Sequence, residues 1–192
     1  MRLYCATGNP GKLREFRLAA EGRGVELEML PGFAAIPPCA ESGGTFEENA
    51  IQKALHYSPH APGPLFADDS GLEADALGGA PGVRSARFAG PGASDQANNR
   101  LLLEKLRGVH HRTARFRCVI GLADRGRLVA TFRGAVEGLI LEEPRGPHGF
   151  GYDPLFFYPA FGCSFGEAPL ERKMAVSHRA QALQAMLDFL LK

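Results

Sequence analysis

The start of the chain constrains the fold most, because it predicts a strand, a tight glycine loop and a helix in direct succession. Leu3 to Ala6 is a short apolar run of the kind that forms a buried strand. The loop "TGNPGK" follows, and the segment "KLREFRLAAEG" then places apolar residues at helical spacing. Asn9 suits an N-cap, and Pro10 suits the first helical position, where its missing N–H costs nothing.

Further strands and helices alternate along the first half of the chain. Gly22 and Gly24 end the first helix, and Val25 to Leu30 is a second candidate strand. Thr45 and Glu48 fit a capping box, which predicts a helix to about Tyr57. Leu65 to Ala67 is the next expected strand, and Ser94 caps a helix that reaches about Arg107. Residues 31–44 and 71–93 are rich in Gly and Pro and are expected to be loops.

The second half predicts antiparallel strands and a final helix. Residues 115–123 and 127–136 are strand-like and flank the turn Asp124-Arg125-Gly126, which indicates a hairpin. The segment "HGFGYDPLFFYP" is a glycine-bearing loop that enters a strand, and Ser177 opens a helix with an apolar stripe. The mixture indicates an α/β fold with a mixed sheet. In open α/β sheets, ligand sites gather in the crevice at the strand ends.

Composition narrows the choice of function. The chain has 192 residues, enough for one large domain or two closely joined lobes. Its net charge of +1 gives no global attraction to nucleic acid or membrane, so any anion site must be local. No apolar run approaches the roughly 18 residues of a transmembrane helix, and the start is too short for a signal peptide. The 4 cysteines are far apart, which favours reduced thiols in a cytoplasm.

The loop "TGNPGK" is the first candidate binding site. A glycine loop between a strand and a helix exposes backbone N–H groups, and the helix N-terminus favours an anion. Lys12 adds a mobile positive charge. The spacing is not that of a Walker loop, because Gly8 and Gly11 are too close together and Leu13 follows the lysine. An ordinary strand-to-helix turn with a surface lysine fits the local pattern equally well.

The segment "FADDSG" places adjacent carboxylates at the end of a strand. Successive residues in a strand point to opposite faces, so Asp68 and Asp69 are not expected to face one ligand together. A carboxylate near phosphates is a reasonable ligand for magnesium, which prefers oxygen and keeps waters. An Asp-Ser-Gly turn, with an aspartate bonded to the backbone, is the alternative.

Two later segments carry further candidates. In "GFGYD", Phe150 could stack on a base and Asp153 could accept a hydrogen bond from a ring or sugar donor. In "SHR", His178 and Arg179 offer donors beside the free N–H groups of a helix start. Core packing of the loop aromatics and a solvated helix start are the alternatives. No G-x-S-x-G elbow and no activated cysteine is recognisable, so the chemistry indicated is metal-aided attack by water.

Taken together, the motifs resemble one family. The segments "ATGNPGKLREF", "TFEENAIQKA", "FADDSGLEADALGGAPGVRSARFAG", "GFGYDPLFF" and "ERKMAVSHRAQAL" occur in this order along nearly the whole chain. They closely resemble the inosine/xanthosine triphosphate pyrophosphatase family, which removes non-standard purine nucleotides. The resemblance implies magnesium-dependent hydrolysis of dITP, ITP or XTP to the monophosphate and pyrophosphate. A maf-like pyrophosphatase of other modified nucleotides is the closest alternative.

The resemblance also implies an architecture and a set of site residues. It implies a single domain over residues 1–192 with two lobes around a nucleotide-binding cleft, a mixed twisted central sheet flanked by helices, and a homodimer. Asp69 would be the catalytic carboxylate and would help to place the metal. The implied substrate-binding residues are Thr7, Gly8, Asn9, Pro10, Gly11, Lys12, Lys53, Ser70, Arg84, Phe150, Gly151, Tyr152, Asp153, Lys173, His178 and Arg179.

The sequence departs from the family pattern at one acidic position. The family commonly has two acidic residues before the Gly-x-Thr-Phe segment, and the first is often a metal ligand. Here that first position is Ala40, followed by Glu41. Either Glu41 takes the role after a small shift of the loop, or Asp69, substrate phosphates and water hold the metal alone.

Overall fold

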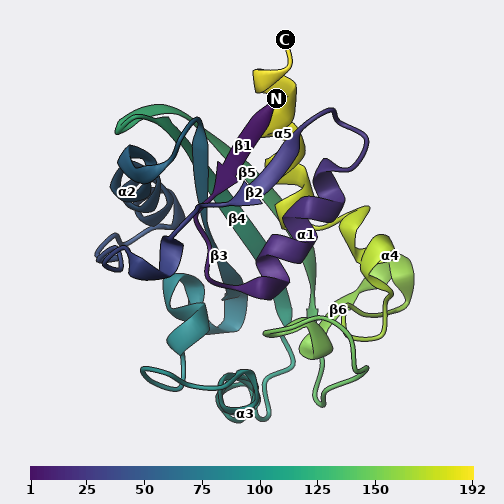
Figure 1. Cartoon of the computed structure of the whole chain (residues 1–192). Coiled ribbons are helices and arrows are strands. Elements are labelled where there is room, and N and C mark those ends of the chain that lie inside the picture. The colour runs from purple at the N-terminus through teal and green to yellow at the C-terminus, as the bar shows by residue number, and fades with distance from the viewer. The chain divides into compact units, whose positions relative to one another are not determined.

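A computed structural model describes residues 1–192. The main feature of the fold is a single mixed sheet. It has the strand order β2-β1-β3-β4-β5-β6-β7 (Figure 1). Strand β1 pairs in parallel with β2 and β3, whereas β6 pairs antiparallel with β5 and β7. The predicted α/β fold with a mixed sheet is therefore confirmed. The strands are β1 (Arg2–Cys5), β2 (Glu26–Met29), β3 (Leu65–Ala74), β4 (Thr113–Asp124), β5 (Arg127–Ile140), β6 (Phe156–Tyr158) and β7 (Cys163–Ser164).

Contacts divide the chain into two compact units. The first unit comprises Met1–Asp69, Cys118–Gly134 and His178–Lys192, and the second comprises Ser70–Arg117 and Ala135–Ser177. The helices are α1 (Pro10–Ala20), α2 (Phe46–Tyr57), α3 (Asp95–Lys105), α4 (Leu170–Met174) and α5 (His178–Leu190). Short 3₁₀ turns are η1 (Phe33–Ala35), η2 (Ser58–His60), η3 (Asp75–Leu77), η4 (Gly82–Arg87), η5 (Asp153–Leu155) and η6 (Pro159–Phe161). No helix is long and apolar enough to cross a membrane.

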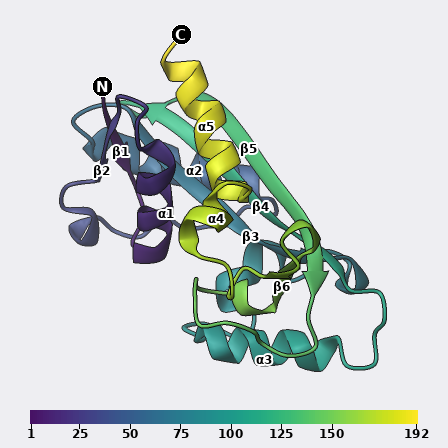
Figure 2. The ribbon, with the colours of Figure 1, turned by 90° about the vertical axis from the view of Figure 1, so that its right-hand side faces the viewer.

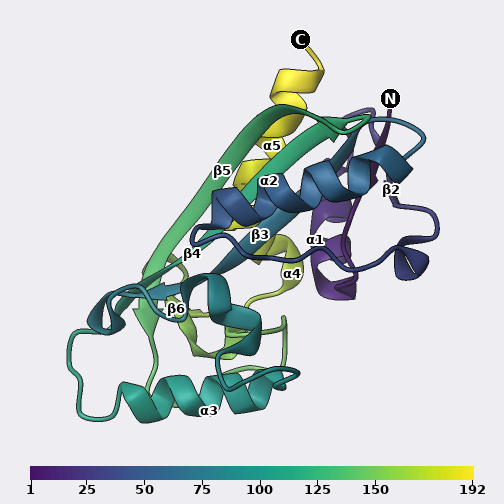
Figure 3. The ribbon, with the colours of Figure 1, turned by 90° about the vertical axis from the view of Figure 1, so that its left-hand side faces the viewer.

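In the first unit, helices cover both faces of the strands. Helices α1 and α5 lie against one face and α2 lies against the other (Figure 3). The core under α1 and α5 contains Leu3, Cys5, Phe16, Ala20, Leu27, Phe66, Cys118, Ile120, Leu122, Ala182, Leu183, Met186 and Leu187. The core under α2 contains Tyr4, Ala6, Leu30, Ala54, Tyr57, Leu65, Ala67 and Ala123. Strand β1 contributes alternate residues to the two cores, as a strand buried on both faces must.

Local sequence signals set the helix starts in this unit. The Asn9 side chain accepts a hydrogen bond from the backbone N–H of Lys12 at 3.1 Å, and Pro10 is the first residue of α1. Thr45 and Glu48 form the predicted capping box of α2. The turn between β4 and β5 has positive φ at Arg125 and Gly126, which suits a tight hairpin. The first helix, the second helix and the hairpin are therefore confirmed.

The second unit packs around its own core. Helix α3, the ends of β3, β4 and β5, and strand β6 surround it (Figure 2). Its buried residues are Leu72, Ala74, Leu102, Leu106, Ala114, Phe116, Val136, Ile140, Tyr152, Leu155, Phe156 and Phe165. The guanidinium of Arg112 donates to the carbonyls of Leu106, Val109, Ile140 and Leu141, and so joins the end of α3 to the end of β5.

The prediction of a continuous loop over residues 71–93 was wrong. Strand β3 continues to Ala74, and η3 and η4 follow within the segment. Leu72 and Ala74 are buried on either side of the half-buried Glu73, which is strand alternation too short to stand out among the glycines. Gly71 permits the continuation, because a Cβ there would lie 2.3 Å from Ser85 Oγ and 2.6 Å from the Gly82 carbonyl oxygen.

Candidate functional site

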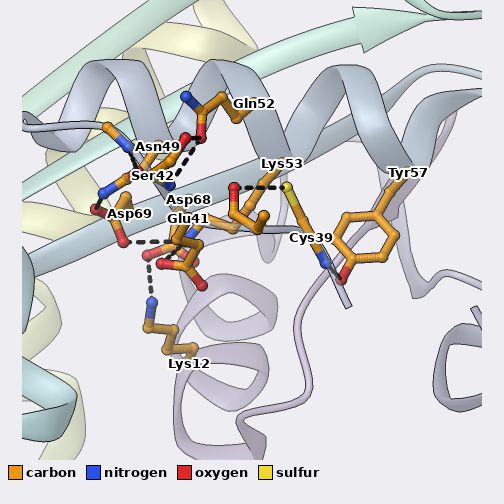
Figure 4. Close-up of polar contacts among 12 residues, drawn as sticks. Lys12, Cys39, Glu41, Ser42, Asn49, Gln52, Lys53, Tyr57, Asp68 and Asp69 are labelled. Carbon is orange, nitrogen blue, oxygen red and sulfur yellow. Dashed lines mark hydrogen bonds and ion pairs between the residues drawn. The ribbon is translucent and has the colours of Figure 1, made fainter. Parts of the chain in front are cut away.

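The two adjacent aspartates on β3 bond to side chains from different helices. Asp68 Oδ2 lies 2.8 Å from Lys12 Nζ, which comes from α1. Asp69 Oδ1 lies 3.0 Å from Lys53 Nζ, and Asp69 Oδ2 accepts a hydrogen bond from Asn49 Nδ2 at 3.2 Å, both from α2 (Figure 4). Because α1 and α2 cover opposite faces, the two carboxylates are divided as strand alternation predicts.

These different surroundings shift the pKa values of the two carboxyl groups in opposite directions. Burial alone would raise the pKa of Asp68, but Lys12, Arg179 and Lys53 together lower it to about 2. For Asp69, burial raises the pKa above its ordinary value, and the ammonium groups of Lys53 and Lys12 offset only part of that effect. Two neighbouring carboxylates with divergent pKa values are typical of a functional site. Asp69 is the better proton acceptor of the two.

Lys53 connects Asp69 to the loop that precedes α2. Its Nζ lies 3.0 Å from Asp69 Oδ1 and 3.5 Å from Glu41 Oε2 (Figure 4). Burial would lower the pKa of Lys53, but Asp69, Asp68 and Glu41 raise it, so the ammonium stays charged. One positive charge is therefore already held between the carboxylates of Asp69 and Glu41.

Whether a divalent cation fits beside Asp69 and Glu41 depends on the number and type of ligand atoms there. The chain has no group of three or more His, Cys, Asp or Glu side chains poised for a metal. Magnesium needs fewer, since one or two carboxylates with phosphates and waters suffice. Asp69 and Glu41 supply hard oxygen ligands and already share the ammonium of Lys53, whereas the side chain of Ala40 has no ligand atom. The donor set therefore fits a magnesium ion that also contacts phosphates.

The "TGNPGK" loop is built as the sequence predicts, except at its lysine. Thr7 is buried and its Oγ1 accepts a hydrogen bond from the Asn9 N–H at 3.2 Å, while residues 8–10 are exposed. The loop thus presents the start of α1 to the surface, as an anion site requires. Lys12 is not a free charge, because it forms the ion pair with Asp68.

Arg179 has a different partner from the one its sequence motif indicates. Its Nη1 lies 2.7 Å from Glu15 Oε2, and both side chains are buried between α5 and α1. Burial would lower the pKa of Arg179, but Glu15 and Asp68 raise it, which keeps the guanidinium charged. His178 is buried beside it at the first position of α5. The structure therefore places the two donors inside the first unit, with Arg179 anchored to Glu15.

In the second unit, the "GFGYD" loop is closed by a buried ion pair. Lys173 Nζ, from α4, lies 2.6 Å from Asp153 Oδ2, and this oxygen also accepts the Phe150 N–H at 3.0 Å. Lys173 Nζ lies 5.2 Å from the Phe150 ring centroid. Gly149 has a φ of 76°, and a Cβ there would meet Asp153 Oδ2 at 2.1 Å. Asp153 therefore holds its own loop, a role that the sequence did not indicate.

Two residues that the sequence did not single out, Asn49 and Ser85, form hydrogen bonds to candidate site residues or to the segments that contain them. Asn49 and Lys53 are four apart on α2 and thus share a helix face, a spacing that could have identified Asn49. Ser85 donates to the Gly82 carbonyl and accepts the Leu72 N–H, and its own carbonyl accepts the Tyr152 hydroxyl at 2.7 Å. Its neighbour Arg84 is exposed on η4 and makes no side-chain hydrogen bond. No sequence signal marks Ser85.

Comparison with known proteins then decides the family. A model described as the Ham1 family matches residues 3–189. The chain belongs to the Ham1 family. A dITP/XTP pyrophosphatase from an Exiguobacterium species is 50% identical over 186 residues, covering 97% of this chain and 95% of the relative. One from Geobacter sulfurreducens is 50% identical over 191 residues, covering 98% of this chain and 96% of the relative.

A solved structure agrees with this membership. A HAM1 protein from Coxiella burnetii has a TM-score of 0.88 and 37% identity, covering 100% of this chain and 98% of that one. The resemblance inferred from the motifs and their order is thereby confirmed. Within this Ham1-family chain, the first unit brings together Lys12, Glu41, Asn49, Lys53, Asp68 and Asp69, and the second brings together Phe150, Asp153 and Lys173.

Proposed function

We propose that this Ham1-family chain hydrolyses non-standard purine nucleoside triphosphates, namely dITP, ITP and XTP, to the monophosphate and pyrophosphate. The names of its full-length relatives support this reaction. The observation that carries it is Asp69, a buried carboxylate of raised pKa held by Asn49 and Lys53. A carboxylate of this kind can take a proton from water near neutral pH better than its neighbour Asp68.

In the proposed reaction, Asp69 orients a water and accepts its proton. The water oxygen forms a bond to the α-phosphorus while the bond from that phosphorus to the pyrophosphate oxygen breaks, in line with the attack. Lys53 and the backbone N–H groups of the Thr7–Lys12 loop stabilise the negative charge that develops on the departing pyrophosphate. Lys12 joins them when the phosphates draw its ammonium away from Asp68.

Magnesium is the proposed cofactor, with Asp69 and Glu41 as its protein ligands. Their carboxylate oxygens share the ammonium of Lys53 in the structure, which supports a cation at this position. When bound, the ion would neutralise charge on the phosphate oxygens. Glu41 would thus take the role of the acidic side chain that is missing at position 40.

The proposed selection among bases depends on hydrogen-bond donors. Hypoxanthine and xanthine have an oxygen at the six position, where adenine has an amino group. The Tyr152 backbone N–H of the Phe150–Asp153 loop and His178 would donate to that oxygen. These donors would remain unpaired against adenine, which such sites reject strongly. Arg179, Lys173, Ser70 and Arg84 complete the proposed substrate contacts. Residues 1–192 would form one two-lobed domain. The protein would act as a homodimer in the cytoplasm.

A panel of nucleoside triphosphates tests the proposed function. The protein is incubated with magnesium and ITP, XTP, dITP, ATP, GTP or modified pyrimidine triphosphates, and the products are separated. Monophosphate and pyrophosphate from the first three, with little from ATP or GTP, is the expected result. Preference for modified pyrimidines would favour a maf-like enzyme, and release of orthophosphate would overturn the proposed reaction.

A further inference from the structure

Helix α3 presents three polar side chains on one face. Asp95, Asn98 and Asn99 are spaced as i, i+3 and i+4, so they project on the same side of the helix. The apolar residues Leu102 and Leu106 anchor the helix and its C-terminal cap in the core of the second unit. None of the three polar residues belongs to the motifs that carry the family resemblance.

Two of these side chains hold both backbone groups of Gly151 in the "GFGYD" loop. Asp95 Oδ2 accepts a hydrogen bond from the Gly151 N–H at 2.7 Å, and Asn99 Nδ2 donates to the Gly151 carbonyl at 3.0 Å. Gly151 has a φ of 62° and lies outside any strand or helix. Its conformation is intrinsically free, because glycine adopts positive and negative φ with similar ease. The α3 side chains therefore define the position of this loop residue.

The third side chain binds the end of the segment that contains Arg84 and Ser85. Asn98 is buried, its Oδ1 accepts from the Ala89 N–H at 2.8 Å, and its Nδ2 donates to the Ala86 carbonyl at 3.2 Å. The Tyr152 hydroxyl, next to Gly151, donates to the carbonyl of Ser85 in the same segment. One helix face thus fixes two segments that are proposed to bind substrate.

Helix stability accounts for Asp95 in part but not for Asn98 and Asn99. An acidic side chain in the first turn of α3 complements the helix dipole. Asn in a helix interior is a poor helix former, since its side chain competes for nearby backbone groups. The N-cap is already supplied by Ser94, whose Oγ accepts the Ala97 N–H at 3.1 Å. Asp95 and Asn99 instead direct their hydrogen bonds to a loop more than fifty residues away in sequence, with separations of 56 and 52.

We propose that Asp95 and Asn99 are positioning residues that set base selectivity by fixing Gly151. They hold the loop in which Phe150 precedes Gly151 and in which Asp153 closes the ion pair with Lys173. The N–H groups of Phe150, Gly151 and Asp153 already bond within the protein, which leaves the Tyr152 N–H, next to Gly151, as the loop donor for the base. When Asp95 or Asn99 is removed, the loop samples other conformations and the Tyr152 N–H no longer meets the six-position oxygen in a fixed position. This inference rests on the proposed function of the same loop as the wall of the base pocket.

The kinetic test compares Asp95→Ala and Asn99→Ala with two reference variants. Asp95→Asn keeps an acceptor for the Gly151 N–H and should stay within about twofold of wild type in every parameter. Gln96→Ala alters an exposed neighbour on α3 and should change nothing. The two test variants should raise KM for ITP by about three- to tenfold, lower the ratio of kcat/KM for ITP over ATP similarly, and leave kcat within about twofold.

A second measurement separates this inference from the proposed function. Hydrogen–deuterium exchange at residues 149–153 should speed up in Asp95→Ala and Asn99→Ala but not in the reference variants, whatever substrate the enzyme uses. Faster exchange in a protein that hydrolyses none of the nucleotides would contradict the proposed function alone. Unchanged exchange, or unchanged KM and selectivity in an active enzyme, would overturn the positioning role. An equal fall of kcat for ITP and ATP with lowered Tm would also overturn it, since that result indicates general destabilisation.

Discussion

At the scale of single residues, Asp68 and Asp69 show how neighbours in sequence acquire different chemistry. Asp68 is paired with Lys12 on one side of β3, and its pKa is lowered to about 2. Asp69 is bonded to Asn49 and Lys53 on the other side, and its pKa is raised by burial. Asp68 thereby stays ionised at neutral pH, and Asp69 is better suited to accept a proton.

Replacement of Asp69 tests this division of roles. Asp69→Asn keeps the shape and one acceptor for Lys53 but removes the basic carboxylate, so we expect kcat for ITP to fall by about 10²- to 10⁴-fold. The circular dichroism spectrum should stay close to that of wild type. Near-normal turnover in a folded variant would exclude Asp69 as the base.

Glu41→Gln is measured beside Asp69→Asn, because Glu41 is the exposed carboxylate that shares Lys53 with Asp69. It should leave kcat at saturating magnesium within about tenfold of wild type and raise the magnesium concentration needed for half-maximal rate. An unchanged magnesium requirement would show that Glu41 is outside the metal site.

The lowered pKa of Asp68 leads to a prediction about how the free energy of unfolding depends on pH. Its pKa is about 2 in the folded protein against an ordinary 3.8, so the carboxylate stabilises the fold above pH 4. That contribution, on the order of 2 kcal/mol, is lost as the pH falls through the folded value. Urea unfolding from pH 6 to pH 2 should therefore show the gap in unfolding free energy between wild type and Asp68→Asn narrowing below pH 4. A gap that is constant with pH would contradict the pairing with Lys12.

At the scale of elements, Arg112 connects the end of α3 to the end of β5. Its guanidinium donates to carbonyls at both places, and these acceptors lie at or just beyond the ends of α3 and β5. The position of α3, and with it the Asp95 and Asn99 contacts to Gly151, therefore depends on a residue remote from the loop.

Arg112→Met tests this connection, since it keeps an aliphatic stem and removes every donor. We expect the unfolding free energy to fall by about 1.5–3 kcal/mol, because several carbonyls lose a charged donor. Arg107→Met is the matched control, as its exposed side chain makes no such hydrogen bonds, and it should change stability by less than about 0.5 kcal/mol. Equal effects of the two substitutions in urea unfolding would refute the role of Arg112.

Signals that act within a few residues could be predicted at the element scale. Asn9 with Pro10, the Thr45–Glu48 capping box and the Arg125–Gly126 turn each set a local conformation, and each appears where expected. Strand β3 beyond Asp69 was missed because its alternation spans few residues. The strand that "HGFGYDPLFFYP" was expected to enter is present as β6. Strand β7 and helix α4 are short elements whose conformation depends on packing against distant segments.

Partners distant in sequence account for what could not be predicted in the candidate site. The motifs identified Lys12, Asp69 and Lys173 as candidates, but nothing local indicates that Arg179 would bind Glu15, 164 residues away. Asp153 was expected to meet a ligand, and its separation of 20 residues from Lys173 hid the ion pair that it forms. Sequence patterns thus gave the residue types of the candidate site, whereas tertiary packing assigned each charge its counterpart.

At the scale of the whole molecule, the electrostatics are nearly balanced. The net charge is +1, so no long-range field attracts a polyanion to the surface, and association should depend little on ionic strength beyond the local site.

The shared ammonium of Lys53 has a further consequence. Lys53 is the ammonium group that bonds to both Asp69 and Glu41, so two carboxylates share one positive charge. A bare triphosphate that approached this cluster would meet the surplus negative charge. In the proposed function, a nucleotide that arrives with its own divalent cation would restore the balance, so the cation would help to admit the substrate as well as to cleave it.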